Sequence, residues 1–361
     1  MATVIDEPYD LDEDFHLMQE EGDILPAEPL QIARGPMQEW AWLNTCVTAF
    51  GANRAVRRFV VDRDDQGLAW AVLTRPKHAW LEAWRMPGVD ELREPMDFAY
   101  QSLGALEELA TQMIRQGVAL RLARIRADSP TIAVLKKAVG RFGKVVVRPQ
   151  PTYPYIELDD SWRSPVDKLN SRRRSDFRRS LKRAEEFGEV RTEVIAPKEH
   201  ELDRLLDLAF DIEARSWKGE AGTALARDTV RANFFRRYAH QVCQQGILRF
   251  NYLHIGDAVA AMQIAVEQDG ALWLLKVGYD AEFARCSPGS LLIADTIKYA
   301  ADKKLKSYEF LGVSESWTRV WTEQERDTVS VRVYPLSLGG AGALLRDSAD
   351  TLWRRCQRKN S

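Results

Sequence analysis

The sequence has few of the side chains that build metal centres or disulfide frameworks. Its four cysteines are far apart and form no C-x-x-C pair, and its five histidines show no H-x-x-x-H spacing. Closely spaced cysteine and histidine ligands are typical of zinc sites, and paired cysteines are typical of small secreted domains. We therefore expect no bound metal and a reducing compartment.

Long apolar runs are also missing. No run reaches the roughly 18 residues of a membrane-spanning helix, and the start has no basic region followed by an apolar segment. The hydrophobic content of 45% is nevertheless enough for a sizeable core, and 361 residues suit two domains. These features predict a cytoplasmic protein.

Positive charge is absent from the first 33 residues, which contain ten acids and no Lys or Arg. This composition predicts a disordered acidic tail. Because the whole chain carries −2 and this segment −10, residues 34–361 carry +8. A mildly basic body favours an anionic ligand or surface.

Hydrophobic periodicity predicts an α+β protein, because helices and strands alternate in an order that differs from a βαβ dinucleotide fold. We expect two units, each a mixed, mostly antiparallel sheet flanked by helices. The predicted helices cover residues 37–50, 94–117, 129–143, 164–188, 199–217, 228–246 and 288–303. The predicted segments are a tail at 1–33, units at 34–160 and 161–337, and a basic amphipathic helix at 338–361.

Several stretches resemble one family of transferases. They are ARSWKGEAGTAL (214–225), LKVGYDAEFARCSPGSLL (275–292), YEFLGVSESWTRVWT (308–322) and the Arg-rich KLNSRRRSDFRRSLKRAEEFG (168–188). They are similar to GNAT-like acyltransferases of the CelD type, which act in cellulose or exopolysaccharide biosynthesis and are related to the Fem aminoacyl transferases. The resemblance spans residues 37–335. It implies two tandem GNAT-like units that transfer an acyl group to an amine, with acyl-CoA or acyl carrier protein as co-substrate.

The turn between a predicted strand and the helix at 288–303 is the expected donor site. Unpaired N–H groups at a helix start attract phosphate, although a strand-to-helix corner without any ligand could have the same sequence. The sequence RCSPGS departs from the Q/R-x-x-G-x-G/A pattern of GNAT enzymes. Arg285 stands one position too far from the glycine, and Gly289 is the single glycine of the turn. The expected cofactor-binding residues are Tyr279, Arg285, Ser287, Gly289 and Ser290.

Three charged residues near this turn are the predicted catalytic groups. Lys276 ends an apolar strand, where it is either functional or a lysine reaching out from the sheet edge. Glu309 stands in another apolar strand and is either a desolvated general base or the ion-pair partner of Lys276. Asp280 is the reserve base.

Two further segments provide candidate acceptor-binding residues. A helix end runs into a Gly-rich loop suited to an acceptor lid, and aromatic side chains follow the strand that carries Glu309. Core packing explains the tryptophans as well. The acceptor candidates are Arg215, Trp217, Lys218, Glu315, Arg319 and Trp321.

Two basic segments complete the expectations. Residues 171–186 predict a helix with a broad cationic face that is either solvated or binds phosphates of a donor, tRNA or anionic lipid. The helix at 338–361 indicates either peripheral association with an anionic membrane surface or packing on its own domain. The acceptor amine is expected on a cell-envelope lipid, such as a sphingoid-type base, or a polysaccharide precursor, with no DNA partner. The alternatives are a Fem-like transferase that uses aminoacyl-tRNA and a non-catalytic module of a synthase complex.

Overall fold

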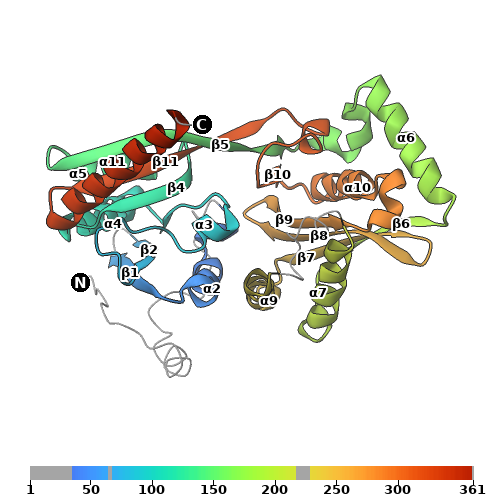
Figure 1. Cartoon of the computed structure of the whole chain (residues 1–361). Coiled ribbons are helices and arrows are strands. Elements are labelled where there is room, and N and C mark those ends of the chain that lie inside the picture. The colour runs from blue at the N-terminus through green and yellow to red at the C-terminus, as the bar shows by residue number, and fades with distance from the viewer. Residues whose placement is uncertain (1–34, 64–66, 217–227, 360–361) are drawn as a thin grey trace. The chain divides into compact units, whose positions relative to one another are not determined.

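The computed structural model describes residues 35–63, 67–216 and 228–359, and the chain forms two compact units (Figure 1). Unit 1 comprises Met1–Pro151 and Asp327–Ser361, and unit 2 comprises Thr152–Arg326. The observed boundaries thus differ from the expected ones, because the last strand hydrogen-bonds to a strand of the first half and the chain after it also belongs to unit 1. The acidic segment 1–33 lies outside the described residues.

Unit 1 combines a three-stranded sheet and three strands of an eight-stranded sheet with helices. Its helices are α2 (Trp40–Phe50), α3 (Val89–Leu92), α4 (Leu103–Arg115), α5 (Pro130–Val139) and α11 (Leu338–Lys359). Its strands are β1 (Arg54–Arg63), β2 (Gly67–Pro76), β3 (Ala99–Tyr100), β4 (Leu120–Arg126) and parts of β5 (Gly143–Glu157) and β11 (Glu325–Pro335). The orders are β1-β2-β3 and β4-β11-β5.

Local capping fixes where the helices of unit 1 begin. The Ser102 hydroxyl accepts from the N–H of Ala105 (3.0 Å), which starts α4 nine residues later than the periodicity predicted. The residues before it form β3 instead and pair with β2. Pro130 begins α5 as predicted, with Ser129 as its cap.

After the end of β5, the elements of unit 2 follow a helix-strand-helix-helix-strand-strand-strand-helix-strand order. Its helices are α6 (Ser171–Glu185), α7 (Glu199–Ala214), α9 (Thr229–Gln244) and α10 (Pro288–Asp302). Its strands are β6 (Val190–Ile195), β7 (Leu248–Ile255), β8 (Ala258–Gln268), β9 (Ala271–Tyr279), β10 (Ser307–Glu309) and the end of β5. The order is β6-β7-β8-β9-β10-β5, in which β9 and β10 run parallel and the other neighbours antiparallel. The predicted α+β class with mixed, mostly antiparallel sheets is confirmed.

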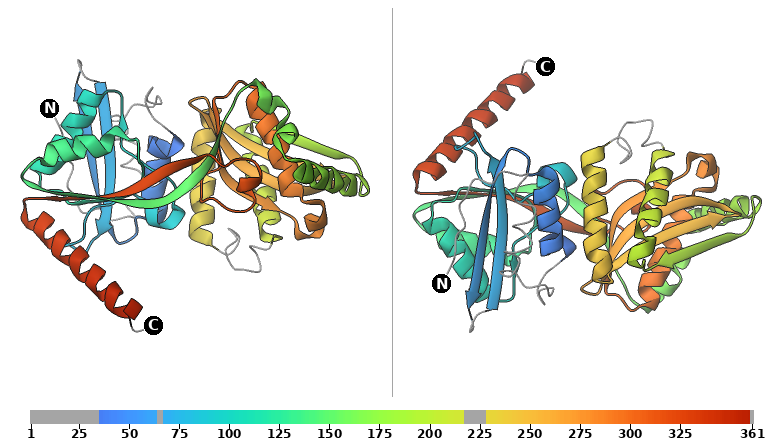
Figure 2. Two further views of the ribbon diagram at one scale, coloured as in Figure 1. Left: turned by 90° about the horizontal axis from the view of Figure 1, so that it is seen from above. Right: turned by 90° about the horizontal axis from the view of Figure 1, so that it is seen from below.

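Helices cover both faces of the sheet in unit 2. Figure 1 shows α10 on one face and α7 with α9 on the other, and the two views of Figure 2 show these faces in turn. The α10 face is closed by a core that includes Leu272, Leu274, Ile297 and Tyr308. Burial of this apolar area drives the packing of α10 on the sheet.

A β-bulge in β9 changes which side chains share a face. Ile264 of β8 pairs with Lys276, but the next residue, Ala265, pairs with Leu274, so Leu275 is the extra residue. Strict alternation along the strand would place Lys276 on the same face as Leu272 and Leu274, but the structure places it on the other face. The bulge turns Lys276 toward α7 and α9, where it contacts Glu213 and Phe235.

Candidate functional site

The two parallel strands of unit 2 separate after a short pairing. β10 pairs with β9 only over Ser307–Glu309, which lie opposite Ala271–Trp273. The next residue, Phe310, donates its N–H to the Pro154 carbonyl (3.1 Å), so the chain continues along β5. Within the described ranges, Leu274–Tyr279 of β9 therefore has a strand partner only on the β8 side. An extended ligand with amide groups can pair with such an open edge.

A buried carboxylate and a lysine meet beside this edge. Glu213 is fully buried on the apolar face of α7, three residues after Phe210 and four after Ala209. Its Oε1 lies 3.6 Å from Nζ of Lys276, whose side chain is 21% exposed. The same Nζ lies 4.9 Å above the centre of the Phe235 ring. The lysine thus connects a buried carboxylate to the surface.

Gly278 permits this close approach of α7 to β9. A Cβ atom at this position would lie 3.1 Å from Cα of Glu213 and 3.1 Å from Cε of Met262. Any larger residue would therefore push α7 away from the sheet. The glycine of the KVGYD stretch is explained by packing between helix and strand.

Glu309 has a different partner from the predicted one. Its buried carboxylate accepts hydrogen bonds from Nε and Nη2 of Arg326 at 2.6–3.1 Å and from the Ser307 hydroxyl at 2.8 Å. The Arg326 guanidinium also stacks 3.7 Å from the ring centre of Tyr155. The expected ion pair with Lys276 was wrong, because Lys276 faces α7. A bidentate arginine and a hydroxyl thus hold the carboxylate of Glu309 in place.

Asp280 also has structural partners. One carboxylate oxygen accepts from the N–H of Glu282 (3.0 Å) and caps a short 3-10 helix, Ala281–Cys286. The other lies 2.9 Å from Nη1 of Arg215, which is 55% exposed. The structure thus brings together one predicted base and one predicted acceptor residue. Trp217 and Lys218 lie outside the described residues.

The predicted donor turn forms the start of α10. Ser287 is the N-cap residue in the left-handed region (φ 49°), and Pro288 occupies the first helical position. Gly289 follows, and a Cβ there would lie 3.9 Å from the Tyr279 ring, at ordinary contact distance. The Ser290 N–H bonds back to the Ser287 carbonyl (2.9 Å). The side chain of Arg285 is exposed, and its carbonyl accepts from Arg183 of α6.

The remaining acceptor candidates lie after β10. Trp321 is buried in the core on the α10 face, with its ring centre 6.4 Å from that of Phe177, so it serves packing. Glu315 accepts from Nε1 of Trp317 (2.9 Å), and exposed Arg319 donates to the Ser314 hydroxyl (3.2 Å). Only Glu315 and Arg319 of this group are therefore accessible.

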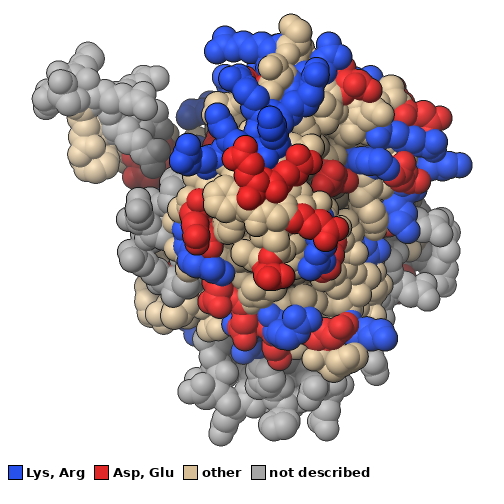
Figure 3. Space-filling view, turned by 90° about the vertical axis from the view of Figure 1, so that its right-hand side faces the viewer, with Lys and Arg blue, Asp and Glu red and all other residues tan. Residues whose placement is uncertain are grey.

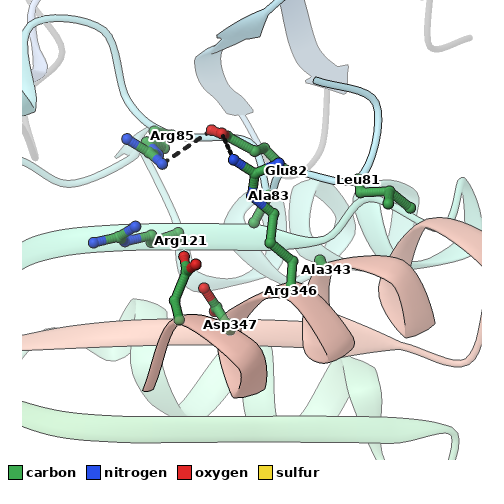
Figure 4. Close-up of a pocket in the computed structure, with 9 residues that line it drawn as sticks. Leu81, Glu82, Ala83, Arg85, Arg121, Ala343, Arg346 and Asp347 are labelled. Atoms are coloured by element: carbon green, nitrogen blue, oxygen red, sulfur yellow. Dashed lines mark hydrogen bonds and ion pairs between the residues drawn. The ribbon is translucent and has the colours of Figure 1, made fainter. Parts of the chain in front are cut away.

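A charged pocket in unit 1 explains how the C-terminal helix is held (Figure 4). Arg346 of α11 pairs with Glu82 (2.7 Å), which also pairs with Arg85 (3.1 Å). Figure 4 shows Arg121 among the side chains that line the same pocket, and burial, followed by repulsion from Arg85, lowers its pKa. The start of α11 therefore packs on its own domain. Among the described helices, none is long and apolar enough to cross a membrane.

Comparison with known proteins identifies the region that holds this site. Residues 171–319 match the family model described as an acetyltransferase (GNAT) domain. This GNAT region begins with α6 and ends after β10, so it contains the Lys276–Glu213 pair and the donor turn. No curated protein matches the sequence.

Solved structures extend the likeness to both units. The crystal structure of FemX has a TM-score of 0.57 at 14% identity and covers 84% of this chain and 92% of its own. A conserved protein of unknown function from Bacteroides thetaiotaomicron VPI-5482 has a TM-score of 0.52 at 10% identity, covering 83% of this chain and 92% of its own. The fold of the chain is thus similar to that of these two proteins, and the family match indicates a GNAT-type transferase domain at residues 171–319.

Two important residues were missed from the sequence. Glu213 stands on an otherwise apolar helical face, and that position was the available signal for a buried functional carboxylate. Arg326 gave no comparable signal, because it lies just after a turn and reaches Glu309 only through the pairing of β5 with β10.

Proposed function

We propose that this protein is an N-acyltransferase that takes its acyl group from a phosphopantetheine thioester, carried by coenzyme A or by a carrier protein. The acceptor is an amine on a cell-envelope lipid or polysaccharide precursor, as the resemblance to the CelD-type branch suggests. The observation that carries this proposal is the separation of β9 from β10 between the Lys276–Glu213 pair and the start of α10.

The donor would lie along β9 and end at α10. Its phosphates suit the N-terminus of α10, where main-chain N–H groups and the helix dipole favour negative charge. The absence of a side chain at Gly289 keeps this end open toward Tyr279. The amide groups of the pantetheine arm would pair with the open edge of β9, as an added strand does.

The Lys276–Glu213 pair would handle the proton of the acceptor amine. When the proton of the pair resides on Glu213, the Lys276 amine is neutral and can take a proton from the attacking nitrogen. The nitrogen then forms a bond to the thioester carbonyl carbon. The tetrahedral intermediate breaks its C–S bond, and the leaving thiolate takes up a proton. Lys276 is the base in this scheme and gives the proton on to the leaving thiolate, whereas Glu213 keeps its own proton and positions the amine.

The bulge in β9 would stabilise the intermediate. Leu275 has no register partner on β8, so the ladder is interrupted at the point where the two parallel strands separate. A main-chain N–H directed at the oxyanion is a usual source of stabilisation in acyl transfer.

A lipid acceptor is supported by the exposed side of α11. Leu338, Leu345 and Trp353 are 91%, 72% and 63% exposed, which is unusual for large apolar side chains. The sequence of this helix also contains four arginines, and this combination suits an anionic membrane surface.

A thiol-release assay tests the proposal. The full chain is incubated with acyl-CoAs from acetyl to palmitoyl and with long-chain amines or amino sugars, and free thiol and amide product are measured. We expect amide formation with at least one pair, and thermal stabilisation by the preferred donor of about 2.7 kcal/mol at a hundredfold excess over its Kd. Absence of product and of stabilisation with every thioester would overturn the proposal.

The FemX likeness favours one other candidate, a transferase that uses aminoacyl-tRNA. That version requires RNA binding that weakens steeply with salt.

A non-catalytic module would bind one of these ligands without turnover, and Lys276→Ala would then leave complementation of a deletion strain unchanged.

A further inference from the structure

Helix α6 has two distinct faces. Phe177, Leu181 and Ala184 lie along one side and pack on the cores of unit 2. Five cationic side chains lie on the opposite half of the helix, and all five are exposed. They are Arg172, Arg178, Arg179, Lys182 and Arg183. We call these five residues the α6 basic face.

This face adjoins the donor turn. Arg183 donates from Nη1 to the carbonyl of Arg285, two residues before the N-cap of α10. At the other end of α6, Arg173 donates to the carbonyls of Arg319 and Val320 (3.0 and 3.2 Å). The helix is therefore fixed at both ends against the GNAT region, with its basic face directed outward.

Little of this charge is neutralised by the protein itself. Figure 3 shows Lys and Arg side chains gathered where α6 lies, at the top of the view. Arg179 pairs with Asp176, whereas Arg172, Arg178 and Lys182 make no ion pair with another described residue. Unpaired cations along one helix mark a surface for an anionic partner.

An exposed aromatic side chain extends the surface. Phe187 follows α6, is 64% exposed and has its ring centre 5.9 Å from that of Phe283 in the 3-10 helix before α10. The backbone that follows Phe187 lies close to the turn at Gly256, because a Cβ on Gly188 would be only 2.7 Å from Cα of Gly256. An aromatic anchor beside a charged rim is typical of a protein interface.

The extent of the surface indicates a protein partner. The 15 residues of α6 span about 22 Å. The phosphates of a coenzyme A molecule bound at the start of α10 cannot engage cations over that length. An RNA would be expected to require a larger basic surface, whereas acids adjoin this one at Asp176, Glu185 and Glu186. One acidic helix of a small domain matches it in length and charge.

We propose that the α6 basic face and Phe187 dock an acidic carrier protein, which places its phosphopantetheine thioester on the donor turn. This rests on the proposed function and names the donor. The carrier phosphate would then sit at α10 while the carrier's acidic helix lies along α6.

The test compares donors that carry the same acyl group. Turnover of acyl-carrier protein, acyl-CoA and acyl-pantetheine is measured for the wild type, for Arg178→Glu/Lys182→Glu and for Phe187→Ala. We expect the double charge reversal to raise the KM for acyl-carrier protein at least about tenfold, with kcat unchanged, and to alter kcat/KM for acyl-pantetheine less than about twofold. Phe187→Ala should raise the same KM by a smaller factor.

A matched control is Lys303→Glu/Lys304→Glu, which reverses two exposed charges at the opposite end of α10. It should leave all three donors unaffected. The docking proposal would be overturned if both double variants lost turnover of acyl-carrier protein equally. It would also be overturned if neither variant lost this turnover while acyl-CoA is turned over. Neither outcome would overturn the proposed function. Absence of turnover with every thioester would overturn the proposed function itself. Binding of tRNA that is lost in Arg178→Glu/Lys182→Glu would replace the carrier protein with RNA.

Discussion

Two buried glutamates lie among the described residues of unit 2, and their surroundings differ. Glu309 on β10 is held by a bidentate arginine and a serine hydroxyl, all at hydrogen-bond distance. Glu213 on α7 lies 3.6 Å from one lysine that is itself partly exposed beside an open strand edge. A guanidinium keeps its protons and holds a carboxylate in place, whereas a lysine amine beside a carboxylate can exchange a proton with it.

Loss of the lysine should have the largest effect. In Lys276→Met the side chain keeps its apolar length but lacks the amine, so we expect kcat to fall by about 10²–10⁴-fold. Steady-state kinetics with the preferred thioester measure this. The unfolding free energy should fall as well, because the substitution leaves the Glu213 carboxylate buried without its lysine, so kcat is measured at a temperature at which the variant is folded.

Glu213→Gln sharpens the same test. This substitution should lower kcat in the wild-type background. It should lower kcat no further when it is combined with Lys276→Met, since the two residues act as one unit. The control is Lys303→Met, which removes an exposed lysine from the end of α10. Independent, additive losses would show that Glu213 does not act through Lys276.

Disruption of the other pair should act on stability. Arg326→Met leaves the Glu309 carboxylate buried without its guanidinium, which costs about 3–5 kcal/mol of unfolding free energy. Urea denaturation measures this difference. Glu309→Gln should cost less, because a neutral amide still accepts from Ser307. If Glu309→Gln abolished turnover while the unfolding free energy stayed unchanged, the two glutamates would have to exchange roles.

Gly278 tests whether the approach of α7 to β9 matters. In Gly278→Ala the new Cβ would lie 3.1 Å from Cα of Glu213, so helix and strand must separate by a few tenths of an ångström. We expect a loss of about 1–3 kcal/mol of stability and a reduced kcat, because the Lys276–Glu213 pair is displaced. Denaturation and kinetics on the same preparation measure both. Full activity in a stable variant would argue against a precise geometry of the pair.

The sequence predicted features that depend on neighbouring residues. The helices at 228–246 and 288–303 were placed nearly as the structure has them, at Thr229–Gln244 and Pro288–Asp302. The start of α5 at Pro130 was also predicted, since proline fixes the first turn of a helix. These features need only local periodicity and capping.

Features that depend on pairing between distant strands could not be predicted. The bulge at Leu275 arises from the register with β8, and it reversed the direction of Lys276. The partner of Glu309 is 17 residues away and meets it only once β5 and β10 pair. The return of the last strand to unit 1 likewise depends on its pairing with β4. A shift of one residue in the strand register moves a side chain to the other face of the sheet, and the sequence of one strand does not determine that register.

The smallest expected effect concerns the donor turn. The protein itself has room for a methyl group at Gly289, since the nearest atom, on Tyr279, would be 3.9 Å away. Gly289→Ala should therefore fold normally, and alanine suits the first turn of a helix better than glycine. If phosphate binds there, the methyl group occupies its approach and should raise the donor KM about three- to tenfold with kcat unchanged.

The matched control is Ala294→Gly, a substitution of the opposite sense in the buried middle of the same helix. It should lower stability and leave the donor KM unaltered. An unchanged KM in Gly289→Ala would mean that the start of α10 is a plain strand-to-helix corner.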